Sequence, residues 1–260
     1  MAEVNASVVK ALTILDRLGQ APRGLRLTDL AEQMGLPEST AHRLLASLAE
    51  LGYVQQRPPA DVYTLGWKIV TLARALDSQL RLVLDLRPYL ERLLARVSHT
   101  VNLAVLQDTQ VMYVESLVPA RMMSLYTPPG ALVPIHATSL GKALLSCLPP
   151  AELDALLPRL ALDARTSHTI TGRDELRAEI EATRRRGFAL DRGEFVPDVN
   201  CVAAPIRDPA GRPLAALSVT ARAVELPPAW EEEFGPLVRD AASAASHALF
   251  AAPASAAALS

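Results

Sequence analysis

A short segment, residues 36–48, carries polar side chains at a spacing that suits contact with an anionic polymer. One face of a helix built over this segment is polar and holds Ser39, His42, Arg43 and Ser47. The opposite face is apolar and holds Ala41, Leu44, Leu45 and Leu48. Hydroxyl groups reach phosphates, and an Arg side chain reaches a phosphate or a guanine. An ordinary surface helix has a similar face, so the neighbouring elements decide the interpretation.

The preceding residues predict two further helices. Ser7 is expected to cap a helix over residues 8–18 that ends at Gly19. After a loop at 20–27, Thr28 is expected to cap a short helix over 29–34, which Gly35 stops. The polar-faced helix then begins with Pro37 in its first position. Two helices joined by such a Gly-containing turn make a helix-turn-helix.

A hairpin is predicted directly after the third helix. Gly52 ends that helix, and residues 53–56 and 62–65 indicate two short strands around a turn at 57–61. Three helices followed by a hairpin form a winged helix-turn-helix. The first 65 residues hold six Lys/Arg and seven Asp/Glu side chains, a net charge of −1. A nucleic-acid contact here must therefore depend on the placement of a few cations and on two copies of the domain.

The order and spacing of these elements resemble a known family. The run "LTDLAEQMGLPESTAHRLLASLAELGYV", followed by "YTLG", looks like the DNA-binding domain of the IclR family of bacterial transcription regulators. On this reading Ser39, Thr40 and Arg43 enter or flank the major groove, and His42 assists. Contacts to phosphates or the minor groove are expected from Thr28, Arg23, Arg26, Gln55, Gln56 and Arg57.

Residues 67–79 predict a connecting helix. No Gly or Pro follows Gly66 in this stretch, so the connector is stiff. The resemblance implies a linker helix that helps dimer formation, although a helix packed on its own domain has the same pattern. We expect a DNA-binding domain at 1–66, the linker at 67–79, an α/β domain at 80–250 and a frayed tail at 251–260.

The second domain mixes helices with strands. The predicted helices cover residues 82–97 (interrupted or started by Pro88), 137–147, 151–157, 174–186 and 227–250. The predicted strands cover residues 101–106, 111–115, 122–126, 188–191, 201–206 and 213–221.

Several of these elements bring polar groups that suit a small ligand. Thr138 is placed to cap a helix whose first N–H groups, those of Ser139, Leu140 and Gly141, point outward at a position that suits a carboxylate. Ser218 and Thr220 alternate with apolar residues, so their hydroxyls share one strand face. The alternative is that these hydroxyls face solvent on an edge strand.

Three segments look like the effector-binding domain of the IclR family: "VPIHATSLGKALL", "RGFALDRGEF" and "CVAAPIRDPAGRPLAALSVTA". The resemblance implies a GAF-like domain in which helices back a mixed sheet and a pocket holds a small organic-acid effector. Effector-contact positions fall on Ser139, Leu140, Asp191, Cys201, Ser218 and Thr220. The apolar walls fall on Met122, Leu125, Val133 and Val199.

Composition excludes several other classes. No run of about 18 uncharged apolar residues is present, and the start shows no signal-peptide core, so we expect a cytoplasmic protein with no membrane partner. Cys147 and Cys201 make no disulfide framework and no Cys-x-x-Cys metal pair. No phosphate-binding Gly-rich motif is present, so we expect no cofactor.

Two catalytic or metal-binding alternatives rest on His136. His136 with Cys201 would be a nucleophile–base pair, and His136 with Asp191 and Cys201 would be a metal site. Nothing in the sequence brings these residues together at a ligand-like spacing, so we expect neither an enzyme nor a metal site.

The sequence therefore predicts an α+β protein: a winged helix-turn-helix, a linker helix and a GAF-like α/β domain. The predicted function is transcription regulation, more often repression, by a homodimer or homotetramer on pseudo-palindromic double-stranded operator DNA, modulated by a small organic acid. The alternative is a small-molecule sensor whose winged-helix module docks a protein.

Overall fold

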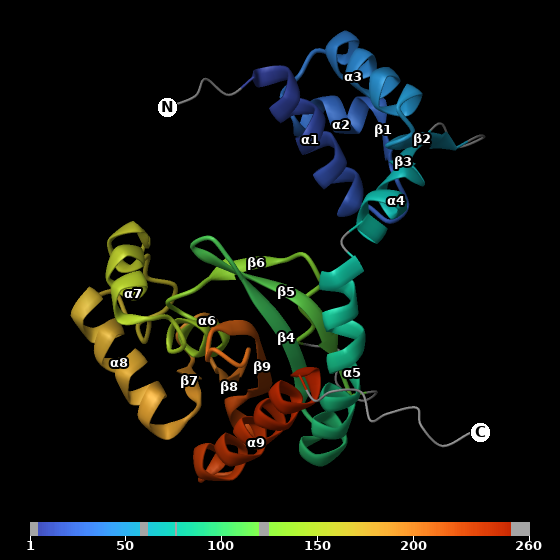
Figure 1. Ribbon diagram of the computed structural model, residues 1–260. Helices are drawn as coiled ribbons and strands as arrows, with labels where there is room; N and C mark the ends of the chain where they lie inside the picture. The colour runs from blue at the N-terminus through green and yellow to red at the C-terminus, as the bar shows by residue number, and fades with distance from the viewer. Residues whose placement is uncertain (1–4, 58–61, 76, 120–124, 251–260) are drawn as a thin grey trace, which may run out of the picture. The chain divides into compact units, whose positions relative to one another are not determined.

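The computed structural model describes residues 5–57, 62–75, 77–119 and 125–250 (Figure 1). The chain divides into two compact units, Met1–Leu80 and Arg81–Ser260. Each unit has its own hydrophobic core, and each is described by itself.

The first unit contains the predicted three helices. They are α1 (Ala6–Gly19), α2 (Leu27–Gln33) and α3 (Glu38–Glu50). The cap of α1 is Asn5 and not Ser7, because the Asn5 Oδ1 atom accepts from the Ser7 N–H at 2.9 Å. Ser7 lies inside the first turn, where its hydroxyl is no longer placed to cap the helix.

A three-stranded antiparallel sheet completes this unit. Its order is β1-β3-β2, with β1 at Leu25–Arg26, β2 at Val54–Arg57 and β3 at Val62–Leu65. The hairpin agrees with the prediction within a residue, and the turn at 58–61 lies outside the described residues. Strand β1 falls in a segment predicted as a loop, because two residues are too short to give an alternating pattern.

The helices pack through the apolar residues that their spacing indicates. Ile14 and Leu18 of α1, and Ala41 and Leu45 of α3, are almost fully buried in one core. The apolar face of α3 therefore points inward, and its polar face is left on the surface.

The predicted linker is divided between two helices in the structure. Helix α4 covers Lys68–Ala75 and helix α5 covers Asp77–Val97; residue 76 lies outside the described part. Helix α5 is longer than predicted and contains Pro88 in its interior. Its described apolar residues Leu86, Leu90 and Leu93 are buried in the core of the second unit.

The second unit is built on a six-stranded sheet in the order β6-β5-β4-β9-β8-β7. The strands are β4 (Thr100–Gln107), β5 (Gln110–Leu117), β6 (Leu132–Pro134), β7 (Ala189–Arg192), β8 (Val199–Arg207) and β9 (Pro213–Arg222). All pairings between the described strands are antiparallel. The expected mixed sheet is therefore wrong for this chain.

Two of the differences in this sheet involve short segments. Strand β6 was not predicted, because three residues with a terminal Pro carry little β signal. The strand predicted at 122–126 lies mostly outside the described residues, and Leu125 and Tyr126 are not in a strand.

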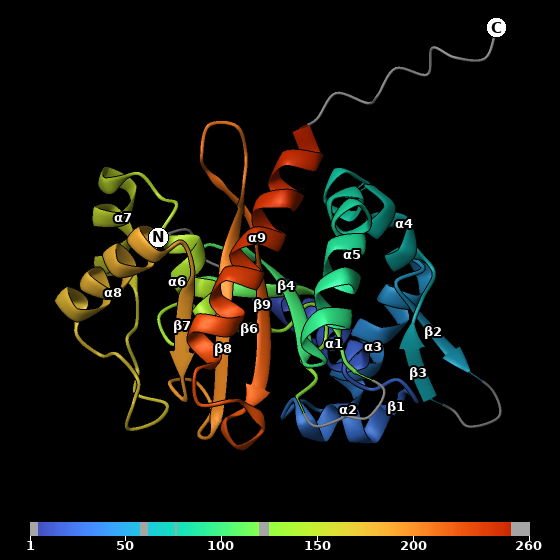
Figure 2. The same cartoon turned by 90° about the horizontal axis from the view of Figure 1, so that it is seen from below.

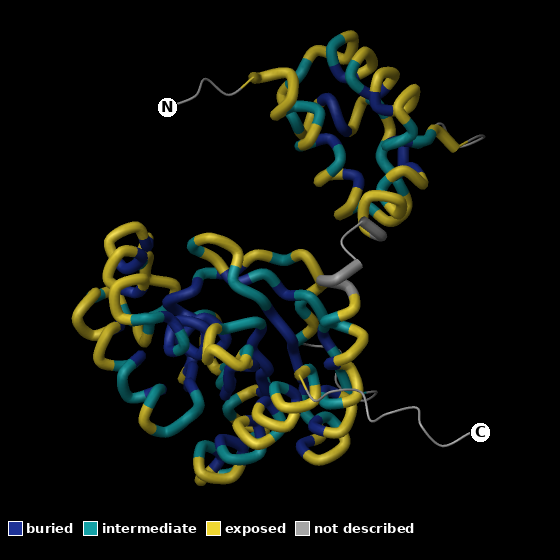
Figure 3. Tube along the Cα trace, in the orientation of Figure 1, coloured by how far each residue is buried: buried dark blue, intermediate teal, exposed yellow. Residues whose placement is uncertain are grey.

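Helices cover both faces of the sheet (Figures 1 and 2). Helix α5 and helix α9 (Trp230–Phe250) pack on one face, and α9 lies along β8. The other face is covered by α6 (Ser139–Leu145), α7 (Pro150–Leu156) and α8 (Arg173–Arg186). Figure 3 shows the buried residues concentrated along the strands between these layers. Within the described residues, no helix combines the length and apolar character needed to span a membrane.

Candidate functional site

The exposed face of α3 carries the side chains that the sequence predicts. Ser39, His42 and Arg43 are exposed, and Thr40 is half-buried. The described residues place no carboxylate in ion-pair distance of Arg43. The Ser47 hydroxyl donates to the Arg43 carbonyl oxygen at 3.1 Å, so it is already used within the helix. Pro37 is the N-cap residue and not the first helical residue.

The small sheet brings two predicted cationic residues together. Arg26 of β1 and Arg57 of β2 both pair with Val62 of the central strand β3. Side chains of directly opposed residues lie on the same face of a sheet. Arg26 and Arg57, both exposed, therefore flank Val62 on one face of the wing, an arrangement that the sequence pattern did not predict.

The remaining predicted DNA-contact residues also lie on this unit. Arg23 is exposed in the loop before β1, and Gln55 and Gln56 lie in β2. Thr28 is exposed, but the expectation that it caps α2 is wrong. Helix α2 begins at Leu27, so its N-cap is Arg26 and Thr28 lies within the first turn. Its hydroxyl remains near the helix start.

A cavity of about 250 Å³ lies in the second unit. Its lining includes several predicted effector-site residues: Leu125, Ser139, Leu140, Asp191, Val199, Cys201, Ser218 and Thr220. The predicted wall residue Val133 does not line it; Val133 lies in β6 and is buried in the hydrophobic core. Met122 lies outside the described residues. The other lining residues are Asn102, Tyr113, Tyr126, Thr127, Thr138, Phe195 and Val196.

One wall of the 250 Å³ cavity, which we call the effector pocket after the predicted site, is a row of hydrogen-bonded polar side chains. Asn102 of β4 accepts from the Ser116 hydroxyl at 2.8 Å and donates to the Thr220 hydroxyl at 3.1 Å. Thr220 in turn donates to the Cys201 sulfur at 3.3 Å. The hydroxyl of Ser218 receives only a long contact of 3.4 Å from Asn102. Within this row of side chains, the Ser218 hydroxyl proton has no described acceptor and is available to a ligand.

Asp191 contributes a carboxyl group that is 3 % exposed. It pairs with Cys201 across β7 and β8, and its Oδ1 atom accepts from the Glu194 N–H at 2.7 Å. Burial is the largest influence on Asp191 and raises its pKa to about 7, although the Glu194 N–H and Lys142 oppose this shift. The carboxyl group is thus partly protonated at neutral pH.

A buried ion pair lies beside Asp191. The Lys142 ammonium donates to Glu194 Oε1 at 2.6 Å, and both side chains are almost fully buried. The second oxygen of Glu194, Oε2, has no partner among the described groups. Burial raises the pKa of Glu194, and Lys142 partly offsets the shift. Lys142 therefore compensates the negative charge of Glu194. Asp191 has no ion-pair partner among the described residues, and its charge is removed only when its carboxyl group is protonated.

The start of α6 has less free hydrogen-bonding capacity than the sequence predicts. Thr138 does cap this helix, and its hydroxyl accepts from the Gly141 N–H at 3.2 Å. The Gly141 N–H is consequently not available to a ligand. Gly141 serves packing instead, because a Cβ atom at this position would overlap the Ile135 carbonyl.

The structure does not assemble the catalytic or metal-binding alternatives. The His136 Nε2 atom lies 3.1 Å from the Asp163 carbonyl oxygen, and His136 does not line the effector pocket. The described residues contain no cluster of three or more His, Cys, Asp or Glu side chains that would hold a metal ion. Cys147 and Cys201 are both free thiols.

A winged helix-turn-helix unit with an exposed polar face on α3, followed in the chain by an antiparallel α/β unit with a ligand-sized pocket, is typical of one class of protein, the ligand-responsive DNA-binding regulators. Residues 7–58 match the family model described as the IclR helix-turn-helix domain. Residues 74–247 match the family model described as the bacterial transcriptional regulator IclR C-terminal domain. The chain therefore belongs to the IclR family of bacterial transcription regulators, a family of DNA-binding regulators and not of enzymes.

Characterised relatives extend over most of the chain. The HTH-type transcriptional regulator XynR of Escherichia coli K12 is 33 % identical over 243 residues, which cover 94 % of this chain and 96 % of that protein. The transcriptional repressor IclR of the same strain is 30 % identical over 238 residues, which cover 91 % of this chain and 87 % of the relative.

Solved structures share the fold. An IclR homolog from Microbacterium hydrocarbonoxydans, crystallised in complex with 4-hydroxybenzoate, matches with a TM-score of 0.78 and 26 % identity. The match covers 93 % of this chain and all of that chain.

Proposed function

We propose that this chain is a repressor whose binding to operator DNA is modulated by a small organic acid held in the effector pocket. The observation that carries this proposal is the pocket itself. Its volume of about 250 Å³ is near the lower end of ligand sites, and its wall combines hydroxyls, an amide and a protonatable carboxyl group. Such a wall suits a small, polar acid. The 4-hydroxybenzoate complex of a structural relative supports the same class of ligand.

The DNA-contacting residues on this proposal are those exposed on α3 and the wing. Ser39, Thr40, His42 and Arg43 face the major groove, and Arg23, Arg26, Thr28, Gln55, Gln56 and Arg57 contact the backbone or the minor groove. Arg43 supplies the base contact, because its guanidinium is exposed and has no described carboxylate partner. Arg26 and Arg57 hold the wing against the phosphates on either side of Val62.

The proposed assembly is a dimer or a tetramer in the bacterial cytoplasm. Two copies of the first unit would read a pseudo-palindrome whose half-sites are about one helical turn apart. Effector binding would change the free energy of placing both units on the operator together, so occupancy of one site affects the other.

Substitution of Arg43 tests the DNA-reading role. An operator sequence is first selected by the wild-type protein from random duplex DNA, and affinities are then measured by gel shift at fixed salt. Arg43→Ala is expected to lower the affinity about tenfold to a hundredfold, the value of one bidentate base contact. Arg96→Ala removes an exposed arginine from the second unit and should leave affinity unchanged. Equal affinities for Arg43→Ala and wild type would refute this role.

Substitution of the pocket hydroxyls tests the effector role. Thermal-shift screening with oxo-acids, hydroxy-acids and aromatic acids, starting with 4-hydroxybenzoate, identifies a responsive ligand. The double variant Ser218→Ala/Thr220→Val should weaken the effector response and spare DNA binding without effector. Ser218→Ala alone should account for more of the loss, because the Thr220 hydroxyl is engaged by Asn102 and Cys201. Loss of both activities would instead identify a structural pair.

A further inference from the structure

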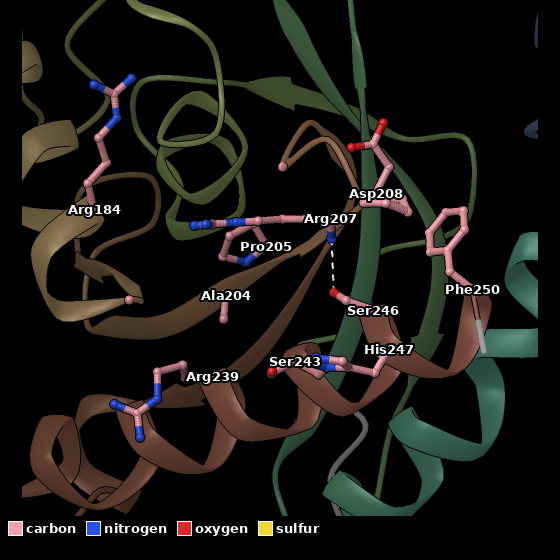
Figure 4. Close-up of a pocket in the computed structure, with 13 residues that line it drawn as sticks. Arg184, Ala204, Pro205, Arg207, Asp208, Arg239, Ser243, Ser246, His247 and Phe250 are labelled. Atoms are coloured by element: carbon pink, nitrogen blue, oxygen red, sulfur yellow. Dashed lines mark hydrogen bonds between the residues drawn. The ribbon is translucent and has the colours of Figure 1, made fainter.

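A second cavity lies where the sheet changes width. Strand β7 pairs with β8 from the pair Arg192 and Asn200 to the pair Ala189 and Ala203. Strand β8 continues beyond this pairing to Arg207. The last four residues of β8 thus have no described strand neighbour on that side. Beside them, between the end of α8 and helix α9, is a cavity of about 830 Å³ (Figure 4). We refer to it as the α9 cavity.

The α9 cavity shares no lining residue with the effector pocket. It is more than three times as large, and its volume falls within the range of drug-sized ligand sites. Apolar surface is provided by Ala204, Pro205, Pro209 and Phe250. It is therefore a separate site with room for a larger molecule.

The described edge of β8 in this cavity lacks free backbone N–H groups that would pair with an added strand. Pro205 has no N–H group to offer a neighbour. The Arg207 N–H already donates to the Ser246 hydroxyl of α9 at 2.9 Å (dashed line in Figure 4). Because these two edge positions offer no free N–H group, side chains rather than backbone groups would recognise an occupant.

Three arginines from three elements line the same part of the cavity. Figure 4 shows Arg184 of α8, Arg207 of β8 and Arg239 of α9 on one side, with Asp208 and Phe250 on the other. Arg239 lies close to the end of α8 because position 187 is glycine: a Cβ there would come within 2.8 Å of Arg239 Cδ. Gly187 also has a φ of +83°, which favours glycine.

Two of these charges are already compensated. Arg184 pairs with Glu181 and also donates to the Ser146 and Leu148 carbonyls. Arg239 pairs with the adjacent Asp240.

The third charge, on Arg207, is not compensated. It has no carboxylate within ion-pair distance among the described residues, and Asp208 is engaged by the Arg212 N–H. Arg207 neighbours the Cys147 thiol, but burial raises the pKa of that thiol, so it stays neutral. Arg207 therefore presents a guanidinium without an ion-pair partner beside the apolar wall, and the Asp208 carboxylate lies on the other side of the cavity (Figure 4).

We propose that the α9 cavity is a second small-molecule site that binds a bulky organic monoanion, a carboxylate or sulfonate on an apolar ring system, with Arg207 as its counter-ion. The apolar part of the ligand packs against Phe250 and the two prolines. This site is independent of the proposed effector pocket and needs no change in the proposed DNA contacts.

The test uses the full chain and the fluorescent probe 8-anilino-1-naphthalenesulfonate, a monoanion with bulky aromatic rings. Titration should give one site per chain. Arg207→Gln should weaken binding at least tenfold, and Arg207→Lys should retain most of it. Ser243→Trp, which introduces an indole from an exposed position of α9 that lines the cavity, should block it. The matched control is Arg212→Gln, on the same turn but outside the lining, which should bind like wild type.

Two further measurements separate this site from its alternatives. The double variant Ser218→Ala/Thr220→Val should bind the probe normally, because it alters only the effector pocket. Unchanged probe affinity in both Arg207→Gln and Ser243→Trp would overturn the proposal. If both variants also change the sedimentation coefficient while probe affinity stays the same, the cavity face is instead a contact between copies of the chain, and the proposal is wrong.

Discussion

At the scale of single residues, Asp191 decides the charge of the effector pocket. The ionisable groups around it are Glu194 and Lys142, Cys201 of the neighbouring strand β8, and Tyr113 of β5. Burial raises the pKa of the Tyr113 hydroxyl and of the Cys201 thiol, so both remain neutral at physiological pH. Asp191 is thus a pocket group that changes charge near neutrality, with its pKa raised to about 7.

Asp191 should make folding less favourable as the pH rises. Its pKa is raised from 3.8 in the unfolded chain to about 7 in the folded chain. Below about pH 4 the group is protonated in both states, and between pH 4 and 7 the unfolded state loses its proton first. The free energy of unfolding should therefore fall across this interval, by up to about 4 kcal/mol from this group alone.

Asp191→Asn removes this titration and keeps an acceptor for the Glu194 N–H. In urea unfolding, the difference in unfolding free energy between the variant and wild type should grow in favour of the variant from pH 4 to pH 7. A difference that does not vary with pH would contradict the raised pKa of Asp191.

Local sequence patterns predicted part of the effector pocket, but they could not predict the residues that distant strands contribute. Ser218 and Thr220 were predicted from strand alternation, and the prediction that they share a face holds in β9. Asn102 was missed, although it hydrogen-bonds to both. It lies in an apolar strand 116 residues before Ser218, and only the pairing of β4 with β9 brings them together. Sequence spacing carries no information on such non-local pairing.

At the scale of elements, helix α6 depends on one glycine. The helix is entirely buried, and it packs against the segment that contains Ile135. Because a Cβ at position 141 would overlap the Ile135 carbonyl, backbone atoms must move to accommodate any side chain. The position of the lining residues Ser139 and Leu140 therefore depends on Gly141.

Gly141→Ala should destabilise the second unit by about 3 kcal/mol or more, because the overlap is with backbone and cannot be relieved by a rotamer change. Gly19→Ala is the matched control. A Cβ at that position would lie 3.9 Å from Leu65 Cδ1, so this variant should be neutral or gain about 0.5–1 kcal/mol of helix propensity. Chemical denaturation measures both, and a Gly141→Ala variant as stable as wild type would show that α6 has room to shift.

Helices with a clear apolar period, such as α8, were predicted well, and the shortest strands, β1 and β6, were not. Helix α8 begins one residue before the predicted start because its apolar period is clear. It ends at the predicted residue because Gly187 follows it. Strand β1 has two residues, and its partner β3 lies more than thirty positions later. The pairing of Arg26 and Arg57 on either side of Val62 follows from this short strand, so it could not be predicted from the sequence.

At the scale of the whole molecule, charge limits how the protein meets DNA. The chain has a formal net charge of −2, and its first 65 residues are net negative as well. On the proposed function, affinity is therefore expected to come from a few placed arginines and from the joint binding of two copies, rather than from a broad cationic surface.

The salt dependence of operator binding should accordingly be modest. Even if Arg43, the proposed base-contact residue, is counted with Arg23, Arg26 and Arg57 as a phosphate-neutralising cation, a dimer gives a slope of log K against log salt no steeper than about −7. Filter binding or fluorescence anisotropy over a range of potassium chloride concentrations measures this slope. A slope steeper than about −9 would require cations beyond those four.

The position of Cys201 in the wall of the effector pocket has a consequence for ligand binding. Oxidants and alkylating agents attack thiolates rather than thiols, and burial holds the pKa of Cys201 far above neutrality. The Cys201 thiol that lines the pocket is therefore expected to react slowly with these reagents and to act as a packing group. On the proposed function, effector binding in this pocket is therefore expected to be insensitive to mild thiol oxidants.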